Sequence, residues 1–167
     1  MGAGDHVRTE VGRIGSAARA SVSHAHAVIR LVGTAGLAAA PQDRFAPKRL
    51  GHLSAAVDLY REDFLAGFTL PDSPTFDEWQ FFQRESLRQL YGQVLEQLVQ
   101  AYRSQQAWAH AIAYARRWLT LDGLHEPAHR ALMRLYAWAG QHSAALRQYQ
   151  ECTRILDAEL GLSLIHI

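Results

Sequence analysis

The sequence predicts an all-α protein. Large apolar side chains recur every three or four residues over long stretches, which is the spacing of an amphipathic helix. No segment alternates apolar and polar residues over the length of a strand. A pattern of residues also repeats with a period of 34 positions, as described below. Together these observations predict a stack of antiparallel helix pairs with about five helices.

Composition and charge are those of a folded protein and exclude several classes. Of the 167 residues, 49% are hydrophobic and 20% are charged, which is typical of a globular domain. The net charge of +1 gives no global reason to expect nucleic-acid binding. The single cysteine, Cys152, excludes an internal disulfide framework. No run approaches the roughly 18 uninterrupted apolar residues that a membrane span needs.

The first 49 residues differ in composition from the rest. They are rich in alanine, glycine, arginine and serine, and Phe45 is the only aromatic residue among them. A core is built mainly from large side chains, so the packed domain is expected over residues 50–161. Residues 1–49 are expected to form a disordered or misjoined arm, with at most a short helix over Ala25–Val32.

Five helical segments are expected in order from Leu50. The first runs to Phe68, on a stripe of large side chains at spacings of three and four: Leu53, Val57, Tyr60, Phe64 and Phe68. Pro71 and Pro74 break this helix because proline is not tolerated in a helix interior. Pro74 suits the first turn of the next helix, which extends to about Ser104. The remaining helices are expected over residues 108–121, 127–139 and 143–160.

The 34-residue repeat predicts how these helices pack. The matching positions are Leu98 and Leu132, Tyr102 and Tyr136, Gln106 and Gly140, Ala111 and Ala145, and Trp118 and Cys152. This period is that of the tetratricopeptide repeat, in which each unit is a helical hairpin. The alanines would let paired helices approach closely, the tyrosines would fill the space between neighbouring pairs, and Gly140 would make a tight turn. We therefore expect a tetratricopeptide-like, right-handed stack.

Several blocks of sequence carry a family resemblance. They are Leu59–Phe68 (LYREDFLAGF), Leu70–Pro74 (LPDSP), Ala113–Arg117 (AYARR), Ala128–Met133 (AHRALM) and Ala145–Cys152 (ALRQYQEC). With these blocks, residues 50–161 resemble the bacterial transcriptional activator domain, which occurs in regulators of the antibiotic regulatory protein type and in larger ATPase-containing relatives. The resemblance implies an all-helical module that transmits or assists transcription activation and is not itself the DNA reader.

The same resemblance implies partners and a cellular setting. The expected function is protein interaction and activation within a bacterial transcriptional regulator in the cytoplasm, without cofactors, membrane contact or enzymatic activity. The expected partners are other domains of the same regulator or a second protomer, and the transcription machinery. A generic tetratricopeptide scaffold that binds a peptide or a partner protein is the alternative.

Both ends of the sequence depart from the family pattern. Residues 1–49 lack the strands and the recognition helix of the winged helix-turn-helix that usually precedes this domain. We therefore expect a truncated fragment without direct sequence-specific DNA binding, whose DNA-binding domain is absent from this chain. Residues 162–167 (LSLIHI) resemble the translated end of a sequencing-library transposon, and we expect them to be an artefactual tail.

A candidate partner-binding groove follows from the repeat positions. The polar and aromatic side chains that fall on the expected concave face are Gln93, Glu96, Gln100, Arg103, Arg130, Arg134 and Trp138. The three arginines could hold a carboxylate in a bidentate manner, with Trp138 as an apolar platform. The alternative is a solvated charged face without a ligand.

One short motif points to a different chemistry. The segment from His125 to His129 (HEPAH) matches a pattern in which two histidines on one helix bind zinc while the glutamate activates water. Pro127 belongs in a first helical turn, which leaves His125 at or outside the edge of the helix. A zinc hydrolase through His125, Glu126 and His129 is therefore a remote alternative, and a half-buried structural His129 is the expectation. Cys152 is expected to be a buried, inert thiol, and no catalytic, cofactor-binding or metal site is predicted.

Overall fold

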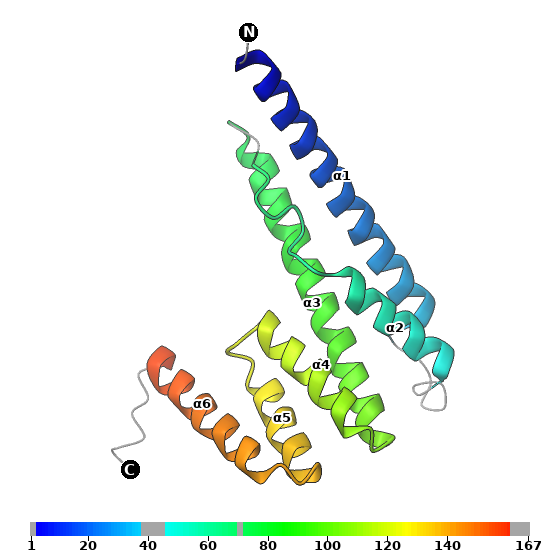
Figure 1. Cartoon of the computed structure of the whole chain (residues 1–167), viewed down its shortest axis with the longest axis vertical. Helices are drawn as coiled ribbons and strands as arrows, with labels where there is room; N and C mark the ends of the chain where they lie inside the picture. The colour runs from blue at the N-terminus through cyan, green and yellow to red at the C-terminus, as the bar shows by residue number, and fades with distance from the viewer. Residues whose placement is uncertain (1–2, 38–45, 70–71, 161–167) are drawn as a thin grey trace. The chain divides into compact units, whose positions relative to one another are not determined.

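The computed structural model describes residues 3–37, 46–69 and 72–160, and within them it confirms the all-α class. Six helices follow one another along these residues, one more than expected (Figure 1). The chain divides into two compact units, residues 1–91 and 92–167. Helix α3, Pro74–Ser104, contributes to both units.

The first unit contains α1 (Ala3–Ala35), α2 (Pro47–Leu59) and the beginning of α3. Helices α1 and α2 lie side by side as a hairpin (Figure 1). The buried positions of α1 are three or four residues apart: Ala25, Val28, Val32 and Ala35. The apolar residues buried from α2 are Leu50, Leu53, Ala56 and Val57. Each helix therefore buries one apolar stripe, as an amphipathic helix should.

Arg49 of α2 closes the end of α1. Its side chain is buried, and its Nε donates to the carbonyl oxygen of Ala35 at 3.1 Å. Its Nη2 donates to the carbonyl oxygen of Gly36 at 3.0 Å. The last carbonyls of a helix lack donors within the helix, and a cation there also complements the helix dipole. The end of α1 is therefore capped by a residue of the following helix.

This arrangement differs from the arm that the sequence analysis expected over residues 1–49. Helix α1 has 33 residues, whereas only a short helix over Ala25–Val32 was expected. The physical reason is the size of the buried side chains, because this face uses alanines and valines instead of aromatic residues. Residues 38–45 of the expected arm, and the expected tail at 162–167, lie outside the described residues.

Helix α2 ends at Leu59, so the expectation of a helix to Phe68 is corrected. Beyond it, Leu65 has a φ of 52° and Gly67 a φ of 72°, which a right-handed helix does not allow. Phe64 and Leu65 are nevertheless buried in one cluster with Ala25 and Leu87. The apolar stripe in this part of the sequence therefore marks core residues of an irregular segment.

Two polar side chains fix this irregular segment, residues 60–69. The Nε2 atom of buried Gln80, on α3, donates to the carbonyl oxygens of Leu65 at 2.8 Å and Phe68 at 3.1 Å. The N–H of Leu65 donates to Ser21 Oγ of α1 at 2.9 Å. Backbone groups that leave a helix need such partners when they are buried.

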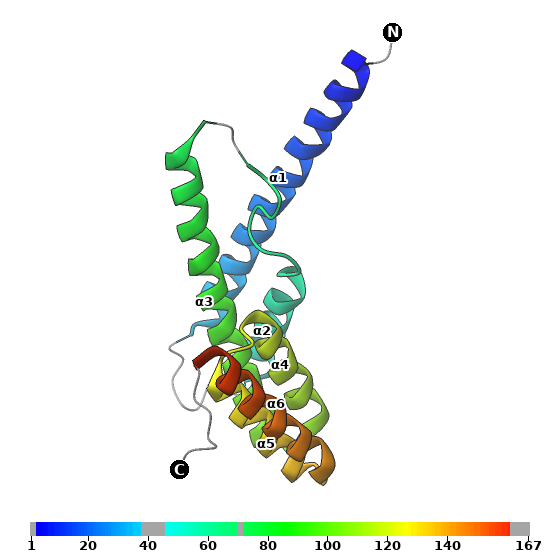
Figure 2. The same cartoon turned by 90° about the vertical axis from the view of Figure 1, so that its left-hand side faces the viewer.

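The second unit continues from Gly92 through the end of α3 into α4 (Trp108–Leu121), α5 (Glu126–Trp138) and α6 (His142–Leu160). Consecutive helices run in opposite directions, and α4, α5 and α6 pack in order (Figures 1 and 2). Their bounds agree with the expected ones to within one residue. The core joins Val99 to Ala111, Ala115, Leu132 and Leu135, and Ala111 is fully buried, as a close helix approach requires.

The 34-residue repeat extends to the turns between paired helices. Gln106 has a φ of 57° and Gly140, the matching residue, a φ of 73°. In both turns the next residue donates its N–H back over five positions, Ala107 to the carbonyl of Tyr102 at 2.9 Å and Gln141 to that of Tyr136 at 2.8 Å. A left-handed residue with this bond is a common end of a helix. The tight turn expected at Gly140 is confirmed.

Tyr102 faces the second helix of its own hairpin, whereas Tyr136 bonds to Arg116 of the preceding hairpin. Tyr102 stacks on Tyr114 of α4, with ring centroids 5.5 Å apart, and on His110 at 5.2 Å. The residues 34 positions later are Gln148 and Ala144, and both line one hollow together with Tyr136. The residues that match the ring partners of Tyr102 thus lie near Tyr136, but the hydrogen bond of Tyr136 is made with α4.

Candidate partner-binding groove

The candidate groove lies in the second unit on the first helices of the two hairpins. Six of the seven predicted residues line one hollow of about 190 Å³, namely Glu96, Gln100, Arg103, Arg130, Arg134 and Trp138. The seventh, Gln93, is exposed and does not line it. The spacings of three and four within α3 and within α5 place these side chains on one face of each helix.

Apolar residues form the floor of the groove. Val99, Trp118 and Leu135 line it and are buried, and Ala131 is half-buried. Trp118 comes from α4 and was predicted only as a packing residue. Trp138 at the rim is 50% exposed, and the centroid of its ring lies 5.8 Å from the centroid of the Trp108 ring. A half-exposed tryptophan beside cations is a common feature of protein-binding surfaces.

The charges of the groove are only partly neutralised. Arg130 Nε lies 3.0 Å from Glu126 Oε1, but both side chains are about half exposed, so this pair is weak and can exchange partners. The guanidinium carbon of Arg103 lies 5.9 Å from the centre of the Trp138 ring. Arg134 is exposed and has no hydrogen-bond or ion-pair partner among the described residues. An incoming carboxylate would therefore find at least one free guanidinium.

The histidines of the zinc-like motif have other roles. His125 precedes α5, and its ring packs on Trp118 with centroids 4.8 Å apart. His129 is 3% exposed, more buried than the half-buried residue expected. Its Nε2 lies 2.9 Å from the carbonyl oxygen of Gly123, and its Nδ1 lies 2.7 Å from Nε2 of Gln148. One neutral tautomer satisfies both bonds, so both ring nitrogens of His129 are already used.

Two further observations concern reactive groups. Among the described residues, no group of three or more histidine, cysteine or acidic side chains is placed to hold a metal ion. Cys152 is buried, as expected. Its burial raises the pKa of the thiol, and the negative charge of Glu126 raises it further. A thiol with a raised pKa is a poor nucleophile.

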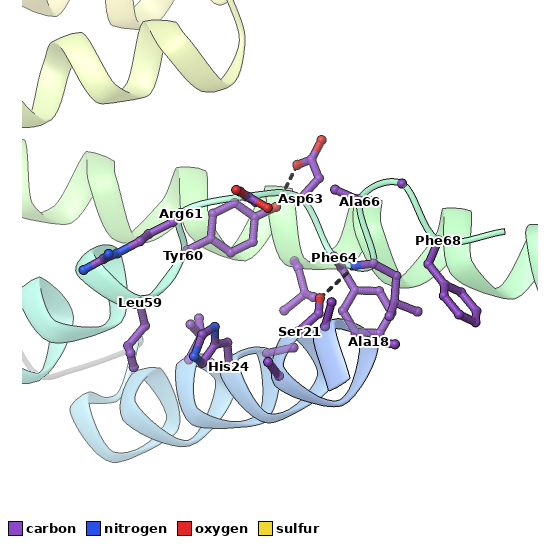
Figure 3. A pocket seen from close by; sticks show the side chains of 18 residues that line it. Ala18, Ser21, His24, Leu59, Tyr60, Arg61, Asp63, Phe64, Ala66 and Phe68 are labelled. Atoms are coloured by element: carbon purple, nitrogen blue, oxygen red, sulfur yellow. Dashed lines mark hydrogen bonds between the residues drawn. The ribbon is translucent and has the colours of Figure 1, made fainter. Parts of the chain in front are cut away.

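A second hollow, which the sequence analysis missed, lies in the first unit. It has a volume of about 420 Å³ between α1 and residues 59–68 (Figure 3). Ala18 and Ser21 line it from α1, and Tyr60 and Phe64 line it from the irregular segment (Figure 3). The only signal in the sequence was the family block over these residues, which was expected to be helical.

A polar network supports one wall of this hollow. The hydroxyl of Tyr60 donates to Asp63 Oδ1 at 3.0 Å (Figure 3), and Arg88 Nη1 lies 3.0 Å from the other carboxylate oxygen. The Tyr60 ring also stacks on Tyr91, with centroids 4.5 Å apart. Burial and the neighbouring Asp63 raise the pKa of Tyr60 well above its ordinary value. The neutral phenol is therefore the form that the fold favours.

The fold is all-helical among the described residues and is consistent with a tetratricopeptide-like stack of helices. The chain belongs to the bacterial transcriptional activator domain family, because the model of that family matches residues 25–165. The match begins within α1, upstream of the boundary expected at Leu50. This is a family of regulatory domains and not of enzymes. Comparisons with curated proteins and with solved structures find no match. None of the described helices has the length and apolar character that crossing a membrane requires.

Proposed function

We propose that this chain is the protein-interaction module of a bacterial transcriptional regulator, working in the cytoplasm with a DNA-binding domain that lies outside this sequence. Membership of the activator-domain family supports the regulatory setting. The observation that carries the proposal is the convergence of six polar and aromatic side chains from α3 and α5 on one groove. The partner is another domain of the same regulator, a second protomer or the transcription machinery.

The groove favours an acidic segment that also carries an apolar side chain. Arg134, free of other partners among the described residues, and the weakly paired Arg130 lie four residues apart on α5. They can hold one carboxylate between them, since guanidinium groups bind carboxylates through paired hydrogen bonds. Trp138 and the apolar floor then take the neighbouring side chain.

Fluorine NMR of the full chain labelled with 5-fluorotryptophan tests this proposal. The probe is an acetylated peptide of alternating glutamate and leucine, and Trp138→Phe identifies the Trp138 signal. We expect a saturable shift of that signal, with affinity about tenfold lower in Arg134→Gln because one charged hydrogen bond is lost. Arg147→Gln on α6 is the matched control. An equal affinity in Arg134→Gln and the unaltered protein would remove the groove from the proposal.

The regulatory role has its own test in cells. Arg134→Gln placed in a regulator that contains this module should lower the output of a reporter gene without lowering the amount of regulator. The outcome against a regulatory role is normal reporter output from Arg134→Gln although the unaltered module binds the peptide through Arg134. That outcome would leave only a generic scaffold role.

A further inference from the structure

The side of the second unit formed by α4 and α6 carries a second cluster of arginines. An open hollow of about 540 Å³ is lined by residues of three helices. Arg116 comes from α4, Tyr136 from α5, and Arg147, Glu151 and Arg154 from α6. None of these residues lines the groove described above. The sequence analysis assigned no ligand-binding role to any of them.

Tyr136 contributes a hydroxyl group to the lining of this hollow. The residue is 5% exposed, and its hydroxyl oxygen accepts a hydrogen bond from Arg116 Nε at 2.9 Å. The guanidinium of Arg116 also lies 5.7 Å from the centre of the Tyr136 ring. A phenol both accepts and donates, and among the described residues no acceptor takes the hydroxyl proton of Tyr136. That proton is free to bind an incoming oxygen.

The charges of the hollow do not balance. Arg154 binds Glu151 through two hydrogen bonds, of 2.7 Å and 3.0 Å, which lower the pKa of that carboxyl group. Arg147 is exposed and has no hydrogen-bond or ion-pair partner in the part of the chain that the structure describes. Three guanidinium groups therefore face one carboxylate, a net charge of 3 − 1 = +2.

We propose that this hollow binds a phosphate monoester dianion, with Arg116, Arg147 and the Tyr136 hydroxyl as its donors. The dianion matches the excess charge of the lining residues. Its shape also fits better than that of a carboxylate. The Glu151 carboxylate in the same hollow is satisfied by the single planar fork of Arg154, whereas a tetrahedral phosphate offers three oxygens to donors that come from three helices.

The test is an NMR titration of the full chain, followed through the arginine Nε–Hε signals. The probes are inorganic phosphate, a mononucleotide (AMP) and a phosphoserine peptide, and sodium acetate at equal ionic strength is the planar control. We expect saturable shifts of Arg116 and Arg147 with phosphate and not with acetate. Tyr136→Phe and Arg147→Gln should each weaken phosphate binding about tenfold, because each removes one hydrogen bond to a charged group.

Tyr136→Phe keeps the buried ring, and its helical circular dichroism checks that it folds. Arg134→Gln, in the groove, is the matched control and should bind phosphate normally. A mononucleotide that binds more tightly than inorganic phosphate assigns the phosphate to a small molecule, and a phosphoserine peptide that does so assigns it to a protein side chain. Equal shifts with acetate and phosphate, or an unchanged affinity in Tyr136→Phe, would overturn the proposal.

Discussion

The side chains of His129 and Gln148 join α5 to α6, with 2.7 Å between His129 Nδ1 and Gln148 Nε2. The other ring nitrogen of His129 lies 2.9 Å from the carbonyl oxygen of Gly123 in the turn before α5. A single buried imidazole therefore connects a turn, a helix and the next helix. Both ring nitrogens of His129 are thus used in structural hydrogen bonds instead of zinc binding. We therefore expect His129 to contribute to stability.

Replacing His129 by alanine should lower the free energy of unfolding by about 2 to 4 kcal/mol. The substitution leaves a cavity at a buried position and removes two part-buried hydrogen bonds, to the carbonyl of Gly123 and to Gln148. Urea unfolding followed by circular dichroism measures the loss. His142→Ala, an exposed residue at the start of α6, is the control and should change stability by less than about 0.5 kcal/mol. A His129→Ala protein as stable as the His142→Ala protein would show that the two hydrogen bonds contribute little.

Alkaline pH should destabilise the first unit through Tyr60. The pKa of Tyr60 is raised in the folded protein, whereas the unfolded tyrosine ionises near the ordinary value of 10.0. The folded state therefore holds the proton more tightly. Its stabilisation is complete below pH 10.0 and is lost as the pH rises above that value towards the folded pKa.

The variant Tyr60→Phe separates this effect from general alkaline unfolding. It removes the hydrogen bond to Asp63 and should cost about 1 kcal/mol at neutral pH. Above pH 10.0, however, it should lose less stability with rising pH than the unaltered protein does. Tyr149→Phe, which changes an exposed tyrosine, should leave the alkaline loss as it was. Parallel pH profiles for Tyr60→Phe and the unaltered protein would contradict this account.

The second unit could be predicted from the sequence because its rules are local and repeated. Helical spacing located α4, α5 and α6, and the period of 34 identified matching residues such as Tyr102 and Tyr136. Period and helix geometry together also decide which side chains share a face, and six of the seven candidate groove residues accordingly line one hollow. The sequence analysis did not include the pairing of Arg130 with Glu126, although their spacing of four residues on α5 allows it.

The first unit was harder to predict because its core breaks the usual signals. Helix α1 buries Ala25 and Val28, whose small side chains give little hydrophobic contrast. The segment after Leu59 keeps the spacing of a helix but turns through left-handed residues, among them Leu65, a residue type that rarely adopts this conformation. Contacts with Gln80 and Ser21, distant in the sequence, hold that conformation. The hollow beside α1 arises from this segment and was missed for the same reason.

The two matching turns allow a prediction in which two reverse substitutions have opposite effects on stability. Gln106 and Gly140 both adopt a positive φ, and both are followed by the same backbone hydrogen bond. Side chains other than glycine are strained in this conformation by roughly 1 kcal/mol. Gln106→Gly should therefore raise the free energy of unfolding of the second unit, and Gly140→Gln should lower it, each by about 1 kcal/mol.

Chemical denaturation monitored by helical circular dichroism measures both variants under identical conditions. Gly51→Ala, a change within α2, serves as the control. A Cβ at this position meets open space. The variant should therefore stabilise by up to about 1 kcal/mol through helix propensity alone. The double variant, with glutamine and glycine exchanged between the turns, should return close to the original stability, since distant sites add independently. A neutral Gly140→Gln beside a stabilising Gln106→Gly would contradict this prediction. It would show that the cost of a side chain at positive φ differs between the two turns, although their backbones match.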